Sequence, residues 1–277
     1  MHLLCMGDQH GPTVVLEAGG SNSSITSRKI QSDIAEFARV CAYDRAGFGF
    51  SDPVSGGRTF DQITQDFDDL LVRAGIEPPY ILVGESMGGL MIRNYHRRHP
   101  ENVVGVVLLD AAEEEHTFRR LDELKRMQSV AGTTSWLARF GIVRLLLKLA
   151  PETVGIPANI DPERRKEIVA EYSRPEFFES AELELEAYFS APKEMRQSGG
   201  FGFLGSTPLV VVTHGTPLTG SQEFLEDGWA EAQLRLAALS TDSKLLVAEQ
   251  SGHAISLDQP EFVVDLIRDL IGKTARE

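Results

Sequence analysis

The chain has 277 residues, of which 42% are hydrophobic, 25% charged and 8% aromatic. These proportions are average for a soluble globular protein and exclude a disordered, fibrous or collagen-like chain. The length predicts one large domain, or a core with a subsidiary insertion. With 27 Lys and Arg against 41 Asp and Glu, the formal net charge is −14, which argues against nucleic acid or an anionic membrane as a partner.

Two features of the sequence bear on cellular location. Cys5 and Cys41 have no metal-binding spacing, and two cysteines are too few for a disulfide framework, so a reduced, cytoplasmic chain is expected. Asp8 interrupts the first apolar run, which no Lys or Arg precedes, so no signal peptide is expected. No apolar stretch approaches the roughly 18 residues that a membrane-spanning helix needs.

Short runs rich in β-branched residues alternate with amphipathic helical patterns along the chain. This alternation predicts an α/β fold, with a mostly parallel sheet flanked by helices. The expected strands are Thr13–Ala18, Val40–Tyr43, Ile81–Gly84, Val103–Leu109, Leu209–Thr213 and Leu245–Ala248. The clearest helix lies between Thr59 and Gly75, where Thr59 and Gln62 can form a capping box. Further helices are expected at Leu90–His99, at Leu225–Leu239 and from Pro260 onward.

The alternation stops between residues 113 and 205, where helical patterns follow one another with Pro and Gly between them. We predict a helical cap over 113–205, inserted into a core formed by 1–112 and 206–277. Because the insertion begins where a strand ends, it projects from the edge of the sheet at which open α/β sheets bind ligands.

Two apolar patterns in the insertion suggest what it covers. Residues 136, 140, 143 and 147 form a stripe with basic residues beside it. We interpret the stripe as a cap helix with its apolar face over a pocket, the alternative being a helix on a membrane surface. The aromatic-rich segment 177–189 either lines the same cavity or packs between cap and core. Such a lid implies an enclosed pocket for small or medium substrates.

A strand of apolar residues ends in Gly84-Glu85-Ser86-Met87-Gly88, and a helix follows at once. This is the G-x-S-x-G pattern in the strand–turn–helix context in which serine acts as a nucleophile. A strained turn would lift the Ser86 hydroxyl clear of the backbone, and the two glycines would let strand and helix pass closely. Ser86 is therefore the predicted nucleophile.

Four segments, in order, resemble the α/β-hydrolase family, and the similarity covers most of the chain outside the insertion. They are Val14–Gly20, similar to the family's oxyanion loop, Tyr43–Ser51, similar to its D-R-x-G-x-G-x-S turn, the elbow at Ser86, and Ser251-Gly252-His253. Ala18 departs from the family, which often has histidine before the glycine at this position. The departure weakens assignment to a subfamily more than it weakens the predicted activity.

Ser86 needs a general base, and the resemblance implies His253, in the loop after the last strand. The other histidines are expected to have other roles. His96, His99 and His116 are predicted at the surface, and no motif surrounds His2 or His10.

The acid that orients His253 is an open choice. The usual family position, shortly after Leu209–Thr213, has no carboxylate nearby, and the first candidates, Glu223, Glu226 and Asp227, look like the first turn of a helix. Asp110 ends a buried strand, where its carboxylate needs a hydrogen-bond partner, and some family members are similar in placing the acid there. We predict Asp110 as the acid and keep the other three as alternatives.

Position alone implies that the backbone N–H groups of Gly20 and Met87 hold the oxyanion of the tetrahedral intermediate. Asp44 and Arg45 are expected to stabilise their own turn. The predicted protein is a serine hydrolase that cleaves small to medium carboxylic esters through an acyl-enzyme, without metal or cofactor. Thioesterase, lactonase, C–C hydrolase or peptidase activity, and ligand binding without hydrolysis, remain alternatives. The sequence does not select a natural substrate or an oligomeric state.

Overall fold

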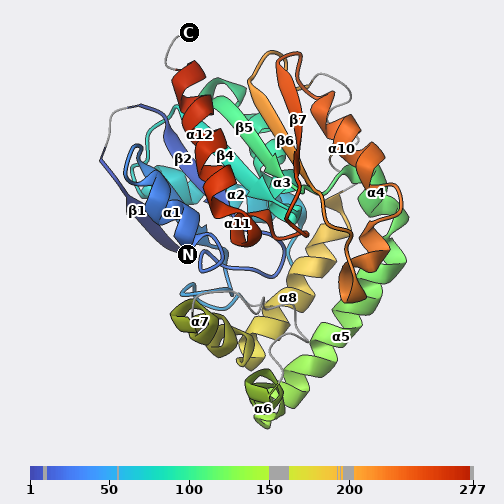
Figure 1. Cartoon of the computed structure of the whole chain (residues 1–277). Coiled ribbons are helices and arrows are strands. Elements are labelled where there is room, and N and C mark those ends of the chain that lie inside the picture. Colours follow the sequence, from blue (N-terminus) through green and yellow to red (C-terminus); the bar gives the residue numbers. More distant parts are fainter. Residues whose placement is uncertain are drawn as a thin grey trace.

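The computed structural model describes residues 1–8, 11–54, 56–149, 162–191, 193, 195 and 203–274. Its strands form one seven-stranded sheet in the order β1-β3-β2-β4-β5-β6-β7 (Figure 1). The strands are β1 His2–Met6, β2 Thr13–Glu17, β3 Val40–Asp44, β4 Tyr80–Glu85, β5 Val103–Leu109, β6 Leu209–His214 and β7 Ser243–Ala248. β1 is antiparallel to β3, and the other neighbouring pairs are parallel. The predicted α/β fold with a mostly parallel sheet is confirmed.

Helices cover both faces of this sheet (Figure 1). Those that follow the strands of the core are α1 Arg28–Ile34, α2 Phe60–Arg73, α3 Met87–Arg98, α10 Trp229–Ala237, α11 Ile255–Asp258 and α12 Pro260–Thr274, with short 3-10 turns η1 Pro100–Asn102 and η3 Gly220–Leu225. Along β2, Val14 and Leu16 join a core with α1 and α12, while Val15 joins a second core with α2 and α3. Since successive side chains of a strand point to opposite faces, a strand between two helical layers must be apolar throughout.

The predicted helices are present, with ends that differ by a few residues. The capping box of α2 forms as expected: Gln62 N–H donates to Thr59 Oγ1, and Thr59 N–H donates to Gln62 Oε1. α3 begins directly after Ser86 at Met87, three residues before the predicted start. α10 begins at Trp229 because Gly228 adopts a left-handed conformation with φ 80° and separates it from η3.

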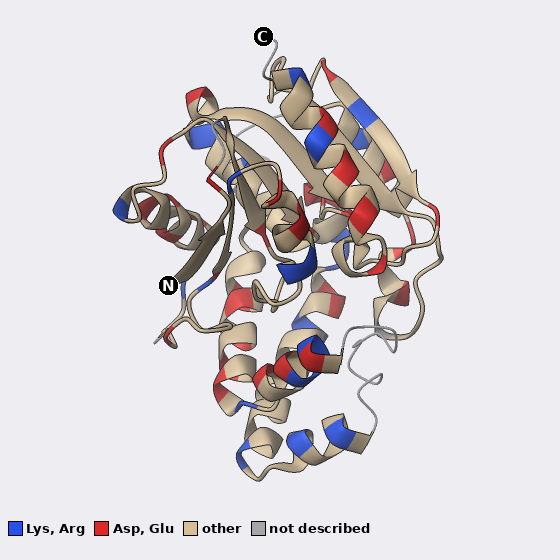
Figure 2. Cartoon of the chain, turned by 60° about the vertical axis from the view of Figure 1, so that its left-hand side comes forward, with Lys and Arg blue, Asp and Glu red and all other residues tan. Residues whose placement is uncertain are grey.

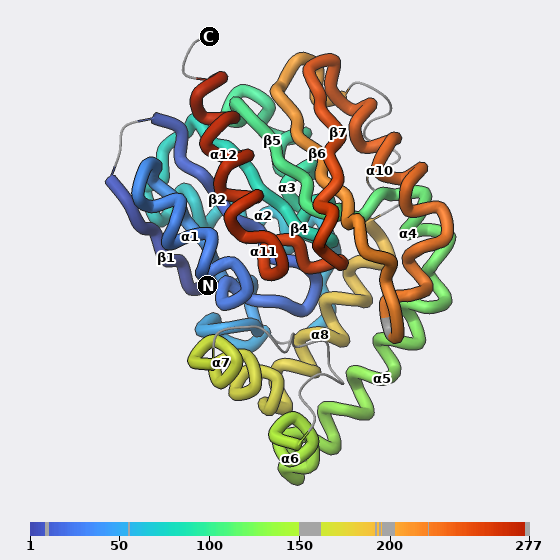
Figure 3. The backbone as a smooth tube through the Cα atoms, in the orientation of Figure 1, coloured from blue at the N-terminus to red at the C-terminus, as the bar shows by residue number. Residues whose placement is uncertain are grey.

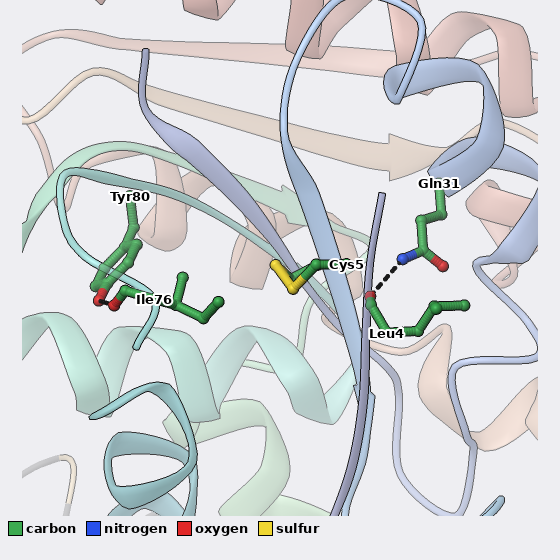
Figure 4. The surroundings of a disulfide bond; sticks show 6 residues. Leu4, Cys5, Gln31, Ile76 and Tyr80 are labelled. Atoms are coloured by element: carbon green, nitrogen blue, oxygen red, sulfur yellow. Dashed lines mark hydrogen bonds between the residues drawn. A yellow bond between two sulfur atoms is a disulfide. The ribbon is translucent and has the colours of Figure 1, made fainter. Parts of the chain in front are cut away.

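The N-terminal strand β1 was not predicted, and it corrects the expectation of reduced cysteines. Cys5 faces Cys41 across the antiparallel β1–β3 pair, and the two form a disulfide. Figure 4 shows this bond with a neighbouring contact that also holds β1, in which Gln31 Nε2 donates to the Leu4 carbonyl at 2.7 Å. The number of cysteines misled the prediction, because two cysteines that face each other on neighbouring strands can form a single disulfide without a larger disulfide framework.

Between β5 and β6 the described residues form helices and no strand, as predicted. They are α4 Glu114–Arg119, α5 Leu121–Arg139, α6 Ile142–Leu149, α7 Pro162–Tyr172 and α8 Pro175–Tyr188. α5 and α8 pack along each other below the sheet (Figure 3). Acidic and basic residues both occur along most of the described helices, while α3 and α6 carry basic residues and no acidic ones (Figure 2). We call residues 113–205 the insertion; their status as a separate unit stays a prediction.

No single helix in the described ranges is long and apolar enough to cross a membrane. α5 and α6 pass that test of length and composition only as a pair, and the chain bends by 99° between them.

Candidate active site

Ser86 occupies a tight turn between β4 and α3. Its backbone has φ 52° and ψ −121°, a conformation that non-glycine residues rarely adopt. A Cβ atom on Gly84 would lie 2.7 Å from the Gly88 carbonyl, and one on Gly88 would lie 2.7 Å from the Ala18 oxygen. Both positions therefore require glycine, as the sequence pattern suggested. The neighbouring strand also holds the turn, since Ser86 N–H donates to the Leu109 carbonyl at 3.0 Å.

His253 reaches Ser86 from the loop between β7 and α11. Its Nε2 lies 2.8 Å from Ser86 Oγ, and its Nδ1 lies 2.6 Å from Asp110 Oδ2. Asp258 holds the base of this loop, because its Oδ2 accepts from the Gly252 N–H at 3.0 Å. The structure thus brings the three residues predicted to carry the chemistry into one hydrogen-bonded chain.

Asp110 lies at the end of β5 and is fully buried, with a left-handed φ of 42°. Trp229 Nε1 donates to its Oδ1 at 2.8 Å, and His214 N–H donates to the same oxygen at 3.1 Å. Burial alone would raise the pKa of Asp110. Hydrogen bonds from His214 and His253 and the charges of their rings lower it by more, so the pKa is about 2. The carboxylate is therefore ionised at neutral pH and able to fix the His253 ring.

The three alternative acids contact other groups. Asp227 pairs with Arg120 at 2.6 Å, and its side chain is 92% exposed. Glu226 accepts from the Leu218 N–H and lies 3.4 Å from His214 Nε2. Glu223 lies in η3. Among the described carboxylates, Asp110 is the one hydrogen-bonded to His253.

His214 is a site residue that the sequence reasoning missed. It is the last residue of β6, just before the segment in which the family more often has its acid, and its Nδ1 lies 2.9 Å from both oxygens of Asp110. Burial lowers the pKa of His214, but the hydrogen bond and charge of Asp110 and the charge of Glu226 raise it more, so the net shift is upward. A search for any polar residue at this position, rather than for a carboxylate, would have found it.

The two predicted oxyanion donors lie beside Ser86. Met87 is the first residue of α3, so its N–H has no acceptor within the helix. A Cβ atom on Gly20 would lie 3.3 Å from Met87 Sδ, and one on Gly19 would lie 3.4 Å from Ser86 Cβ. The loop after β2 therefore packs against Ser86 and Met87, where the sequence predicts the oxyanion site.

Ser86 and His253 face a cavity of about 770 Å³. Its walls combine the core loops with side chains of the insertion. The insertion contributes His116, Thr117, Arg120, Leu124, Met127, Ile168, Tyr172, Leu185 and Tyr188. The cavity thus lies between the sheet edge and the insertion, as predicted for a ligand site of an open α/β sheet.

The predicted apolar stripe of the insertion does not line this cavity. Trp136 and Phe140 are exposed, whereas Val143 and Leu147 pack with Ile25 in a separate cluster. The stripe prediction was therefore wrong about what it covers, because its residues are divided between the end of α5 and helix α6, which meet at an angle of 99° and so do not form one helix face. Within the segment 177–189, Leu185 and Tyr188 line the cavity.

Two histidines predicted at the surface are buried. His96 is 2% exposed and contacts Thr207 Oγ1 at 3.1 Å, and His116 is 3% exposed and contacts the Leu225 carbonyl at 2.9 Å. Helical position misled the prediction, since neighbouring loops cover that face of each helix. His99 lies 3.3 Å from Asp68. His2 contacts Asp44, while His10 lies outside the described residues.

Comparison with known proteins extends these observations. An uncharacterised protein of Bacillus subtilis, YqjL, is 27% identical over 94% of this chain and 83% of its own length. The proline iminopeptidase PfmaB of Pestalotiopsis fici is 24% identical over 96% of this chain and 94% of its own. A thermophilic esterase from Thermogutta terrifontis superposes with a TM-score of 0.68 and 20% identity, covering 99% of this chain and 93% of the esterase. Residues 12–203 match the model of the alpha/beta hydrolase fold, and the chain belongs to that family.

Proposed function

We propose that the protein is a serine hydrolase that cleaves small to medium carboxylic esters. The observation that carries the proposal is the hydrogen-bonded chain from Ser86 Oγ through His253 to Asp110 at the wall of a cavity. A serine hydroxyl is a weak nucleophile unless a base accepts its proton, and this arrangement provides one with a fixed ring orientation.

In the proposed reaction, Ser86 Oγ attacks the ester carbonyl carbon while its proton passes to His253 Nε2. The tetrahedral intermediate collapses to an acyl-enzyme, and the departing alkoxide takes the proton from His253. Water then attacks the acyl carbon with His253 again as base, which releases the carboxylic acid and restores Ser86. Asp110 stabilises the imidazolium in both halves, and the N–H groups of Gly20 and Met87 stabilise the oxyanion.

The cavity supports the size of the proposed substrate. A volume of about 770 Å³ lies within the range of sites for small molecules, and side chains of the insertion close one side of it. We therefore propose that the insertion acts as a cap. A cytoplasmic location, and the absence of nucleic acid or membrane as a partner, also remain proposals; the location no longer has reduced cysteines in its favour.

A panel of matched substrates tests the function. We expect turnover of short-chain aryl esters with a burst of leaving group, and its loss in Ser86→Ala while the protein stays folded. Thioesters and amides of the same acyl group form the comparison, together with lactones of similar size. The amide is included because a relative is named a proline iminopeptidase. Faster turnover of the amide or thioester would reassign the leaving group and keep the mechanism. Binding of the panel without release of product would refute hydrolysis.

A further inference from the structure

Arg45 does more than stabilise the turn in which the sequence places it. Its neighbour Asp44 has that role, since its carboxylate accepts from the Ser24 and Phe50 N–H groups at 2.8 and 3.0 Å. The Arg45 side chain is 3% exposed and leaves the turn. Its Nη2 donates to the Gly19 carbonyl at 2.7 Å, and its Nη1 donates to the Ala18 carbonyl at 2.9 Å. Arg45 thus holds two successive carbonyl groups of the loop after β2.

Two buried carboxylates hold the Arg45 guanidinium in place. Glu17, at the end of β2, pairs with Nη1, and Glu184, on α8 of the insertion, accepts from Nε at 2.6 Å. The second oxygen of Glu184 accepts from the Ser21 N–H at 2.6 Å. A planar guanidinium can serve two carboxylates and two carbonyls at once because its five N–H donors are fixed in direction. The loop is therefore held at Ala18 and Gly19 by Arg45, and at Ser21 by Glu184.

Hydrogen bonds to the Gly19 carbonyl fix where the Gly20 N–H points: Arg45 Nη2 donates to it at 2.7 Å, and the Asn22 N–H donates to it at 3.2 Å. Pro78–Pro79 is the cis peptide of the described chain, so the Gly19–Gly20 peptide is trans. In a planar trans peptide the carbonyl and the following N–H point in opposite directions. Arg45 is buried and does not line the cavity, whereas Gly19, Gly20 and Ser86 do. A carbonyl drawn toward Arg45 therefore directs the Gly20 N–H to the cavity side, beside the nucleophile.

We propose that Arg45 is a positioning residue for the oxyanion site, and that Glu184 makes this site depend on helix α8 of the insertion. The proposal rests on the proposed function, because it assigns a purpose to the Gly20 N–H in acyl transfer. α8 also contributes Leu185 and Tyr188 to the cavity wall. The helix that contacts substrate and the loop that stabilises the oxyanion are thus connected through Glu184, which pairs with Arg45 and accepts from the Ser21 N–H.

Three variants separate this role from general stabilisation. Arg45→Lys keeps the charge and loses the fork of donors. Glu184→Gln keeps the shape of the side chain and removes its charge. If Arg45→Lys does not fold, Glu184→Gln tests the positioning role in its place. Glu171→Gln is the matched control, since Glu171 is a buried glutamate of α7 that joins the insertion to Gly49 and Ser23 without touching residues 18–21.

The expected loss is in turnover rather than in substrate binding. Loss of one oxyanion donor costs about 10²- to 10³-fold in kcat, so Arg45→Lys should lose about 10²-fold with KM within about threefold. We expect about tenfold for Glu184→Gln, whose effect passes through Arg45 and the Ser21 N–H, and less than about threefold for Glu171→Gln. Circular dichroism and thermal unfolding serve as the folding control.

Two readouts report on the oxyanion site itself. A thionoester develops charge on sulfur, a weak hydrogen-bond acceptor, so its turnover should fall much less than that of the matching oxoester. An arylboronic acid forms a tetrahedral adduct with serine, and its Kd should rise about 30-fold or more in Arg45→Lys. Equal losses for oxoester and thionoester, or equal effects of Glu184→Gln and Glu171→Gln, would overturn the proposal. A wild-type protein that binds the boronate but hydrolyses no ester refutes the proposed function instead, and the boronate comparison then decides the role of Arg45.

Discussion

Replacing Asp110 with Asn tests the assignment of the acid, which was the least determined by sequence. The carboxylate accepts from Trp229 Nε1 and the His214 N–H at Oδ1 and faces His253 Nδ1 through Oδ2. An Asn side chain can satisfy Trp229 and His214 with its oxygen, which leaves its NH2 group facing His253. His253 Nδ1 must then accept, so the ring carries its proton on Nε2 and cannot take the proton of Ser86.

The same change of tautomer in a well-studied serine protease lowers kcat about 10⁴-fold, equivalent to roughly 5 kcal/mol of transition-state stabilisation. We expect a loss of this size for Asp110→Asn, with fold and KM retained. The assay is turnover of a chromogenic short-chain ester. Asp227→Asn, Glu226→Gln and Glu223→Gln are controls of matched chemistry, and each should stay within about tenfold of wild type because none of these side chains contacts His253.

One outcome would refute the assignment. If Asp110→Asn stays within tenfold of wild type while one of the three control variants loses activity by orders of magnitude, the acid lies elsewhere. The hydrogen bond between Asp110 and His253 would then have no catalytic purpose.

Three further predictions concern stability, pH and substrate size. Reduction of the Cys5–Cys41 disulfide should lower the free energy of unfolding by about 2–4 kcal/mol and leave turnover at 25 °C within twofold, because the bond lies at the β1 edge of the sheet; an unchanged urea midpoint with dithiothreitol would contradict this. The pKa of His214 is raised in the folded protein, so protonation of its ring stabilises the fold. This stabilisation is complete below the ordinary pKa of 6.5 and is lost as pH rises through the folded-state pKa. The difference in unfolding free energy between wild type and His214→Gln should therefore be larger at pH 5.5 than at pH 9, and the opposite order would refute the charge on His214. Short-chain aryl esters should be hydrolysed faster than emulsified long-chain triglycerides because the cavity is about 770 Å³; activation at an oil–water interface would contradict a cap over the site.

Local patterns predicted the parts of the fold in which neighbouring residues determine the structure. The elbow at Ser86 follows from two glycines that allow close approach, and the α2 capping box follows from Thr59 and Gln62. Parallel strands with both faces covered read as apolar runs, which located β2 to β6, and the apolar run Leu245–Ala248 located the half-exposed edge strand β7. β1 lies in a short apolar run that has no Val, Ile or Thr, so neither the strand nor its disulfide was predicted.

Contacts between distant segments could not be predicted in the same way. His214 joins the site because β6 lies beside β5, which places it against Asp110. A bend of 99° between α5 and α6 separates Trp136 and Phe140 from Val143 and Leu147, so the stripe read as one helix gave no information on what it faces. Arg45 reaches from its own turn to another loop, where it donates to carbonyl groups that lie more than 20 residues away in the sequence. Sequence spacing does not encode such tertiary contacts.

Covalent labelling tests the central claim most directly. A fluorophosphonate reacts with a serine hydroxyl that a neighbouring base has activated, and peptide mass spectrometry locates the adduct. The proposed function predicts one phosphonate on Ser86 in the wild-type protein, and a strongly reduced rate of labelling in His253→Ala. A label on another serine, or no label on a folded protein, would contradict the assignment of Ser86 as the nucleophile.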